Sequence, residues 1–182
     1  LPPERIVMKD HVESLLGRLQ AQALRRAAER ALAPEDERYV KAILDRFRKR
    51  PPHIPKLTWW SDIHPDVEVA GRHLDLYVHY RPRWPFFIPT LAFVLCNKEK
   101  KALAEKDLLE VVAFARLLKD EKRVMRVWAA IASPSGFSDD ALQYCSDFEK
   151  RDIGLVLVDT KKWTSCNSDR AQSRNAADWL KV

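Results

Sequence analysis

The chain has 182 residues, of which 46% are hydrophobic and 32% are charged, and this composition excludes a wholly disordered protein. No stretch approaches the roughly 18 consecutive apolar residues of a transmembrane helix, and the four glycines form neither a dinucleotide-binding motif nor a P-loop. The formal net charge of +6 permits an anionic partner such as nucleic acid.

The N-terminus and the cysteines set an expectation for the compartment. The first residues, Leu1 to Arg5, contain no signal-peptide core, which predicts that the protein is not secreted. Cys96, Cys145 and Cys166 are odd in number and widely spaced, so they predict neither a zinc knuckle nor a disulfide framework. We therefore expect a cytoplasmic protein that does not insert into a membrane.

Two helices are predicted in the N-terminal third. Apolar residues recur every three or four positions over 9–32, and we assign residues 1–34 to a helical extension of the main domain. A second helix is predicted over 35–50, because its first turn is acidic and its last turn is basic. Two prolines at positions 51 and 52 end it.

The middle of the chain favours strands. Short strands are predicted at 56–60 and 67–69, and residues 73–80 alternate between apolar and polar side chains with Asp75 on the polar face. Residues 90–97 are almost continuously apolar, which is typical of a central strand buried on both faces.

Helices and strands then alternate to the end of the chain. The predicted elements are helix 105–118, strand 124–132, helix 138–150, strand 153–158, a polar linker at 164–168 and a helix at 169–180. A meander followed by crossovers predicts an α/β sandwich around a mixed sheet. We place the main domain at 35–163 and treat 164–182 as a C-terminal helical segment.

One ordered set of residues carries candidate chemistry. Asp75 lies in the middle of a strand, and 21 residues later the sequence Cys96-Asn97-Lys98 ends the next strand. Cys96 and Lys98 share a face because side chains in a strand alternate. Further along, a helix opens with Gly136-Phe137-Ser138 and is followed by an apolar strand that ends at Asp159.

This order resembles the PD-(D/E)xK nuclease superfamily, specifically its restriction-endonuclease-like, Mrr-like branch, over roughly residues 35–159. The resemblance implies a three-layer α/β/α sandwich with a mixed central sheet, and a metal-dependent endonuclease that hydrolyses phosphodiester bonds in DNA. It also implies that Asp75 binds Mg²⁺ or Mn²⁺ and that Lys98 is catalytic. Homodimer formation is a further expectation of the family.

The sequence departs from the family pattern at Cys96, where an acid is expected. A thiol is a soft ligand that suits Mg²⁺ poorly. One interpretation is that another carboxylate takes over, and the candidates are Glu110, Glu105, Glu37, Glu68 and Glu99. Glu37 corresponds to the upstream-helix acid of some family members. The alternative is that the catalytic site has decayed and the fold survives as a binding platform.

Two further sets of residues have a functional and a plain structural interpretation. His73 and His79 flank Asp75 and could supply a metal ligand or a base, although such histidines are more often packing or surface residues. The loop that carries Arg81, Arg83 and Trp84 interleaves cations with an aromatic ring, as phosphate contact and base stacking require. The same loop could simply cover the end of a hairpin.

Three functions therefore remain open from the sequence. The first is a metal-dependent DNA endonuclease, which Asp75 and Lys98 favour. The second is a non-catalytic nucleic-acid-binding or scaffold subunit on the same fold, which Cys96 favours. The third is an α/β protein-interaction module without nucleic acid. A contiguous positive surface near Asp75 distinguishes the first two from the third.

Overall fold

The computed structural model of the chain describes residues 3–49, 60, 62–80 and 88–182. The chain divides into two units, Leu1–Leu32 and Ala33–Val182. Helix α1 (Pro3–Arg30) makes up most of the first unit, so a helix is present where the apolar spacing predicts one. None of the described helices is both long and apolar enough to cross a membrane.

The second unit is built around a six-stranded sheet whose strands lie side by side in the order of the sequence. Its strands are β1 (Asp62–Val69), β2 (Arg72–Tyr80), β3 (Thr90–Cys96), β4 (Arg126–Ser133), β5 (Ile153–Asp159) and β6 (Thr164–Asn167). β1, β2 and β3 form an antiparallel meander, β3 to β5 are parallel, and β6 returns antiparallel to β5. The sheet is therefore mixed, as predicted.

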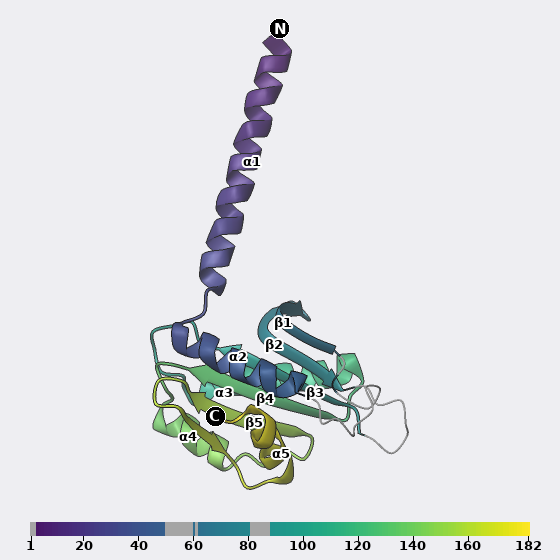
Figure 1. Ribbon diagram of the computed structural model, residues 1–182, viewed down its shortest axis with the longest axis vertical. Coiled ribbons are helices and arrows are strands. Elements are labelled where there is room, and N and C mark those ends of the chain that lie inside the picture. The colour runs from purple at the N-terminus through teal and green to yellow at the C-terminus, as the bar shows by residue number, and fades with distance from the viewer. Residues whose placement is uncertain (1–2, 50–59, 61, 81–87) are drawn as a thin grey trace. The chain divides into compact units, whose positions relative to one another are not determined.

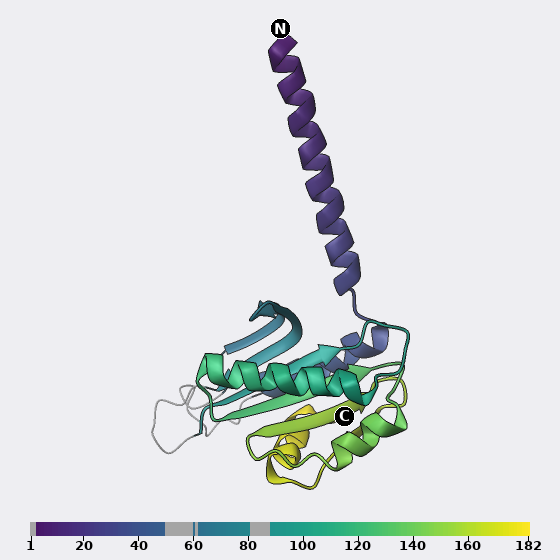
Figure 2. The ribbon, with the colours of Figure 1, turned by 180° about the vertical axis from the view of Figure 1, so that it is seen from behind.

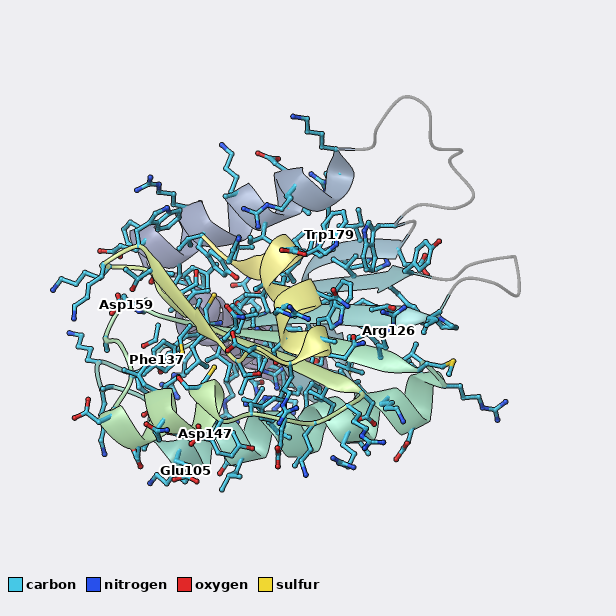
Figure 3. The ribbon with its side chains drawn as sticks, turned by 90° about the horizontal axis from the view of Figure 1, so that it is seen from below. Glu105, Arg126, Phe137, Asp147, Asp159 and Trp179 are labelled. Atoms are coloured by element: carbon cyan, nitrogen blue, oxygen red, sulfur yellow. The ribbon has the colours of Figure 1, made fainter. Side chains whose placement is uncertain are left out.

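Helices cover both faces of this sheet. α2 (Pro34–Arg48) and α5 (Ala171–Leu180) lie on one face (Figure 1), and α3 (Glu105–Lys122) and α4 (Asp139–Ser146) lie on the other (Figure 2). Figure 3 shows the sheet between α2 and the layer formed by α3 and α4. This arrangement confirms the predicted three-layer α/β/α sandwich with a mixed central sheet.

Because both faces are covered, successive residues of the central strands enter two different cores. Leu91, Phe93 and Leu95 of β3 belong to the cluster under α3 and α4. Ala92 and Val94 are equally buried on the face that α2 and α5 cover. This double burial explains why the strand reads as a continuous apolar run in the sequence.

Polar side chains of α2 join it to the C-terminal helix. The Tyr39 hydroxyl donates a hydrogen bond to the carbonyl of Leu180, and Arg46 Nη1 donates to the carbonyls of Trp179 (2.8 Å) and Lys181 (2.9 Å). The last carbonyls of a helix lack partners within that helix. Arg46 therefore satisfies the end of α5 and fixes the two helices on one face.

Both edge strands differ from the predictions. β1 begins at Asp62 rather than at residue 67 and includes Pro65. An edge strand tolerates proline, and among the described residues one side of the β1 backbone has no partner strand. β6 occupies residues 164–167, where we expected a linker. Its four polar or small residues lack the apolar alternation that marks a strand.

Two smaller differences concern the ends of elements. α4 ends at Ser146, four residues before the predicted end, and Phe148 beyond it is buried in the core. The predicted strand at 56–60 lies outside the described residues except for Trp60, whose ring packs against Phe47 and Trp179.

The parallel strands end together at one edge of the sheet. Cys96, which ends β3, pairs with Ala132 of β4, and Ser133 at the end of β4 pairs with Asp159 at the end of β5. Figure 3 shows Asp159 and Phe137 on one side of the domain and Arg126, which begins β4, on the other. The candidate residues that follow β3 and β5 therefore lie at the same edge.

We predict that Gly154→Ala destabilises the second unit by at least about 2 kcal/mol, because overpacking a tight core is costly. A Cβ at position 154 would lie against the carbonyl oxygen of Gln172 and 2.8 Å from the Cβ of Ala176, both on α5. Urea unfolding measures the loss. Gly17→Ala on α1 is the matched control, since a Cβ there meets nothing within 4 Å and should not lower stability. An equally stable Gly154→Ala protein would contradict this packing of α5 on β5.

Candidate functional site

Asp75 and Lys98 lie side by side at the edge where β3 ends. Asp75 Oδ2 accepts a 2.7 Å hydrogen bond from the backbone N–H of Cys96, and Asp75 Oδ1 lies 3.5 Å from Nζ of Lys98. The Asp75 carboxylate is buried, whereas Lys98 is partly open to solvent. The juxtaposition that the strand periodicity predicts is therefore present.

His73 flanks this carboxylate on β2. Its Nδ1 lies 3.9 Å from Asp75 Oδ1, and its Nε2 is bonded to the carboxylate of Asp66 on β1. His79 lies four residues further along β2, where its Nδ1 lies 3.3 Å from the Tyr77 hydroxyl. Of the two histidines predicted to flank the site, His73 is the one whose ring approaches Asp75.

Three polar residues of β2 that follow His73 are buried. Asp75, Tyr77 and His79 are all less than 10% exposed. Their polar groups have partners within the protein: the Tyr77 hydroxyl contacts His79, and Asp75 accepts from the backbone N–H of Cys96.

A second carboxylate, that of Asp36 on α2, interacts with the same site. Asp36 is 1% exposed, and its Oδ1 accepts a 2.7 Å hydrogen bond from the Thr160 hydroxyl. Burial raises the pKa of Asp36 from 3.8 to about 6, the hydrogen bond from Thr160 lowers it, and the negative charge of Asp75 raises it. Lys98 lowers the same pKa, so these groups share one electrostatic environment.

Glu37, which the resemblance pointed to as the upstream acid, is exposed on α2. The side of α2 that is buried carries Asp36, Tyr39, Val40, Ile43 and Phe47. Glu37 therefore does not lie on the side of α2 that faces the sheet. The spacing of the large apolar residues, at positions 39, 40, 43 and 47, would have indicated Asp36.

The Cys96 thiol is held in its neutral form. Burial raises the pKa of Cys96 well above its usual value, and the charges of Asp75 and Asp36 and a hydrogen bond with Asp75 raise it further. Lys98 opposes these effects without reversing them. The side chain at the position of the expected acid therefore carries no negative charge at neutral pH.

The other candidate carboxylates lie elsewhere. Glu110 is on the exposed side of α3, which packs on the opposite face of the sheet from α2. Glu105 lies near Tyr144, whose pKa is raised by burial and further by the charge of Glu105. Glu68 is exposed on β1 opposite His73. Glu99 is exposed in the turn after β3. Arg81, Arg83 and Trp84 lie outside the described residues.

The described part of this site does not fit the Mg²⁺ or Mn²⁺ ion that the resemblance implies. Within residues 3–49, 60, 62–80 and 88–182, no three His, Cys, Asp or Glu side chains converge to hold a metal. The Asp75 oxygens already engage the Cys96 N–H and the Lys98 ammonium. A protonated thiol beside them is a poor ligand for a hard cation.

Lysines gather in the two turns that follow the parallel strands. The basic edge, as we name it, consists of Lys98, Lys100 and Lys101 after β3 and Lys161 and Lys162 after β5. Asn97 and Asp159 hold these two turns. Asn97 donates to the Lys101 carbonyl (2.9 Å), and Asp159 Oδ1 accepts from the N–H groups of Lys161 (3.1 Å) and Lys162 (2.8 Å).

We predict that Asp36→Asn removes a pH dependence of stability. The folded-state pKa of Asp36 is raised to about 6, so between about pH 4 and pH 6 the wild type loses up to about 3 kcal/mol as the pH rises. The variant should match the wild type below pH 4 and exceed it above pH 6, because the amide oxygen still accepts from Thr160. Urea unfolding across this pH range measures the difference.

Glu37→Gln is the control for this experiment, because it removes an exposed carboxylate from the same helical turn. Its pH profile should follow that of the wild type. An Asp36→Asn protein that is less stable than the wild type at pH 7 would show that Asp36 is ionised and stabilising in the folded protein.

Comparison with known proteins adds a distant structural similarity. No family model and no curated protein matches the sequence. The structure is similar to a solved structure titled DNA modification-dependent restriction endonuclease AspBHI, with 16% sequence identity and a TM-score of 0.32. The similarity covers 74% of this chain and 35% of that chain, so this chain spans about a third of that protein's length.

Proposed function

We propose that this chain binds nucleic acid on a nuclease-like α/β/α scaffold without metal-dependent cleavage. The observation that carries the proposal is the chemistry at Cys96. A neutral thiol stands where the resemblance requires an acid, and the neighbouring Asp75 is engaged by the Cys96 N–H and by Lys98. At such a site, a hard cation that is bound to a phosphate finds few protein oxygens that could replace its water ligands.

The basic edge supports a polyanionic partner. Its five lysines extend from the turn after β3 to the turn after β5. Lys98 pairs with Asp75, and the other four form no ion pair with an acid of the described residues. Lysine contacts with phosphates release condensed counterions and give affinity that does not depend on sequence. Duplex DNA is the polyanion that the resemblance implies.

A second candidate function is the metal-dependent endonuclease, and Asp36 is the observation that favours it. This carboxylate is buried beside Asp75 and its pKa responds to the charge of Asp75. Two carboxylates with substrate phosphate and water can hold Mg²⁺ in other enzymes. In this candidate, Asp36 takes the place of the acid missing at position 96.

Titration with Mg²⁺ separates the two candidates. We predict that Cys96→Asp binds Mg²⁺ at least about tenfold more tightly than the native chain, because it adds a hard oxygen ligand beside Asp75. Isothermal calorimetry measures the affinity, and circular dichroism checks that the variant folds. Cys96→Ser is the matched control, since it changes the thiol without adding a carboxylate.

The outcome for the native chain decides between binding and cleavage. Weak Mg²⁺ binding and no cleavage of plasmid DNA with Mg²⁺ or Mn²⁺ support the binding protein. Tight native binding that is lost in Asp36→Ala, together with cleavage, would establish the endonuclease instead.

We predict that DNA affinity falls steeply with salt and that the basic edge sets the slope. Lys161→Ala with Lys162→Ala should flatten the log–log salt slope by about 1.8, which is roughly 0.9 for each lost contact with duplex DNA. Fluorescence anisotropy with a labelled duplex measures it. Lys150→Ala with Arg151→Ala is the control, since it removes the same charge just before β5, at the opposite edge.

An equal loss of slope in both pairs would show that net charge rather than the basic edge drives binding. The absence of binding at low salt would favour the protein-interaction module. Arg81 and Arg83 remain predicted phosphate contacts, and their double replacement by Ala in the same assay tests them. Sedimentation of the free protein and of the complex tests the expected homodimer.

A further inference from the structure

Two cysteines that lie 21 residues apart in the sequence meet between α4 and β6. Cys145, in the last turn of α4, is fully buried, and its Sγ lies 3.4 Å from the carbonyl oxygen of Cys166 on β6. Cys166 packs against the same core cluster and is partly open to solvent. The packing of α4 on the edge strand therefore creates a dithiol.

The two thiols of this dithiol differ in chemical character. A hydrogen bond from the Cys145 thiol lowers the pKa of Cys166 to about 6, and a bond from the Ser146 hydroxyl, whose oxygen lies 3.7 Å from Cys166 Sγ, also lowers it. The same contact with Cys166 raises the pKa of Cys145, and burial raises it further. Cys166 is thus the nucleophilic sulfur and Cys145 is its protonated neighbour.

Small reagents can reach Cys166 through a pocket. The pocket has a volume of about 790 Å³, and its lining includes Phe137, Leu142, Asp159, Lys161, Thr164 and Cys166. Cys145 is not among the residues that line it and is 0% exposed. Access and nucleophilicity therefore favour the same sulfur.

We propose that Cys166 and Cys145 form an oxidation-sensitive dithiol that hydroperoxides convert into an intramolecular disulfide. The Cys166 thiolate attacks one peroxide oxygen, the O–O bond breaks, and the leaving oxygen takes a proton to become water or an alcohol. Cys166 is then a sulfenic acid. The Cys145 sulfur attacks it, the S–O bond breaks, and the hydroxide leaves with the Cys145 proton as a second water.

The electrons balance in this sequence. The two sulfurs together lose two electrons, the peroxide gains two, and a dithiol reductant reverses the change by exchange. Because Cys145 Sγ already lies 3.4 Å from the carbonyl oxygen of Cys166, rotation of the two side chains can bring the sulfurs to the S–S bond length of about 2.05 Å. The product ties the edge strand β6 covalently to α4, on the wall of the pocket.

Cys96 provides an internal reference. This residue is also partly exposed, but burial of its thiol, together with the acidic groups around it, raises the pKa of Cys96. We expect Cys166 to react with iodoacetamide or hydrogen peroxide at least about fivefold faster than Cys96 at pH 7. A larger fraction of Cys166 is thiolate, and this outweighs the lower intrinsic nucleophilicity of a thiolate with a low pKa.

The test uses the chain of residues 1–182 and needs no substitution at first. The reduced protein is treated with a stoichiometric amount of hydrogen peroxide, digested and analysed by mass spectrometry. The expected product is a cross-linked pair of peptides that contain Cys145 and Cys166. Its mass is two hydrogens less than the summed masses of the two reduced peptides, and dithiothreitol separates the pair again. Cys145→Ala should instead accumulate a sulfenic acid at Cys166, which dimedone traps.

Control variants make the assignment specific. Cys96→Ser should give the same cross-link as the native chain, and Cys166→Ser should give none and leave Cys145 unmodified. Faster oxidation of Cys96 than of Cys166 in the native chain would overturn the proposal. So would a Cys166 that forms only disulfides between chains, or that proceeds to sulfinic acid while Cys145 stays reduced.

Discussion

The carboxylate of Asp75 completes the sheet at the point where backbone pairing between β2 and β3 stops. The paired register of these strands ends at Leu76 and Val94, and the N–H of Cys96 then takes Asp75 Oδ2 as its acceptor. A buried N–H without an acceptor costs about 1–3 kcal/mol, and a buried carboxylate needs a counter-charge, which Lys98 supplies. Asp75 and Lys98 therefore have a structural role that needs no metal, and their presence alone does not distinguish a nuclease from a binding protein.

The charges around Asp75 explain why we place the polyanion at the rim rather than in the centre of the site. Asp36, Asp75 and Cys96 are three acidic groups near one ammonium group, that of Lys98. The protein limits the repulsion by keeping protons on Cys96 and, below about pH 6, on Asp36. A phosphate would meet little net positive charge there. The exposed lysines of the basic edge, by contrast, require no desolvation of a buried group.

The spacing of apolar residues predicted the elements whose side chains are buried. It failed where contacts between particular side chains determine the structure. The run at 90–97 and the alternation around Asp75 predicted neighbouring strands, and the layers followed from the order of elements. Glu37 was expected as the upstream-helix acid because of the resemblance, whereas the spacing of the apolar residues of α2 places Asp36 on the buried side of that helix. The pair formed by Cys145 and Cys166 was beyond prediction, because it depends on β6, a polar edge strand without an apolar pattern.

The hairpin of β5 and β6 connects all of these features. Its turn carries Lys161 and Lys162. Two contacts hold that turn to α2: the Thr160 hydroxyl donates to Asp36, and the Arg38 guanidinium lies 4.2 Å from the centre of the Trp163 ring. The β6 strand of the same hairpin carries Cys166.

A disulfide from Cys166 to α4 would restrain the hairpin, whose turn is already held by α2. If that restraint changes DNA affinity by some factor, bound DNA must change the dithiol–disulfide equilibrium by the same factor, because coupling between two equilibria is reciprocal. The reduction potential of the dithiol with and without DNA therefore measures whether the hairpin links the two.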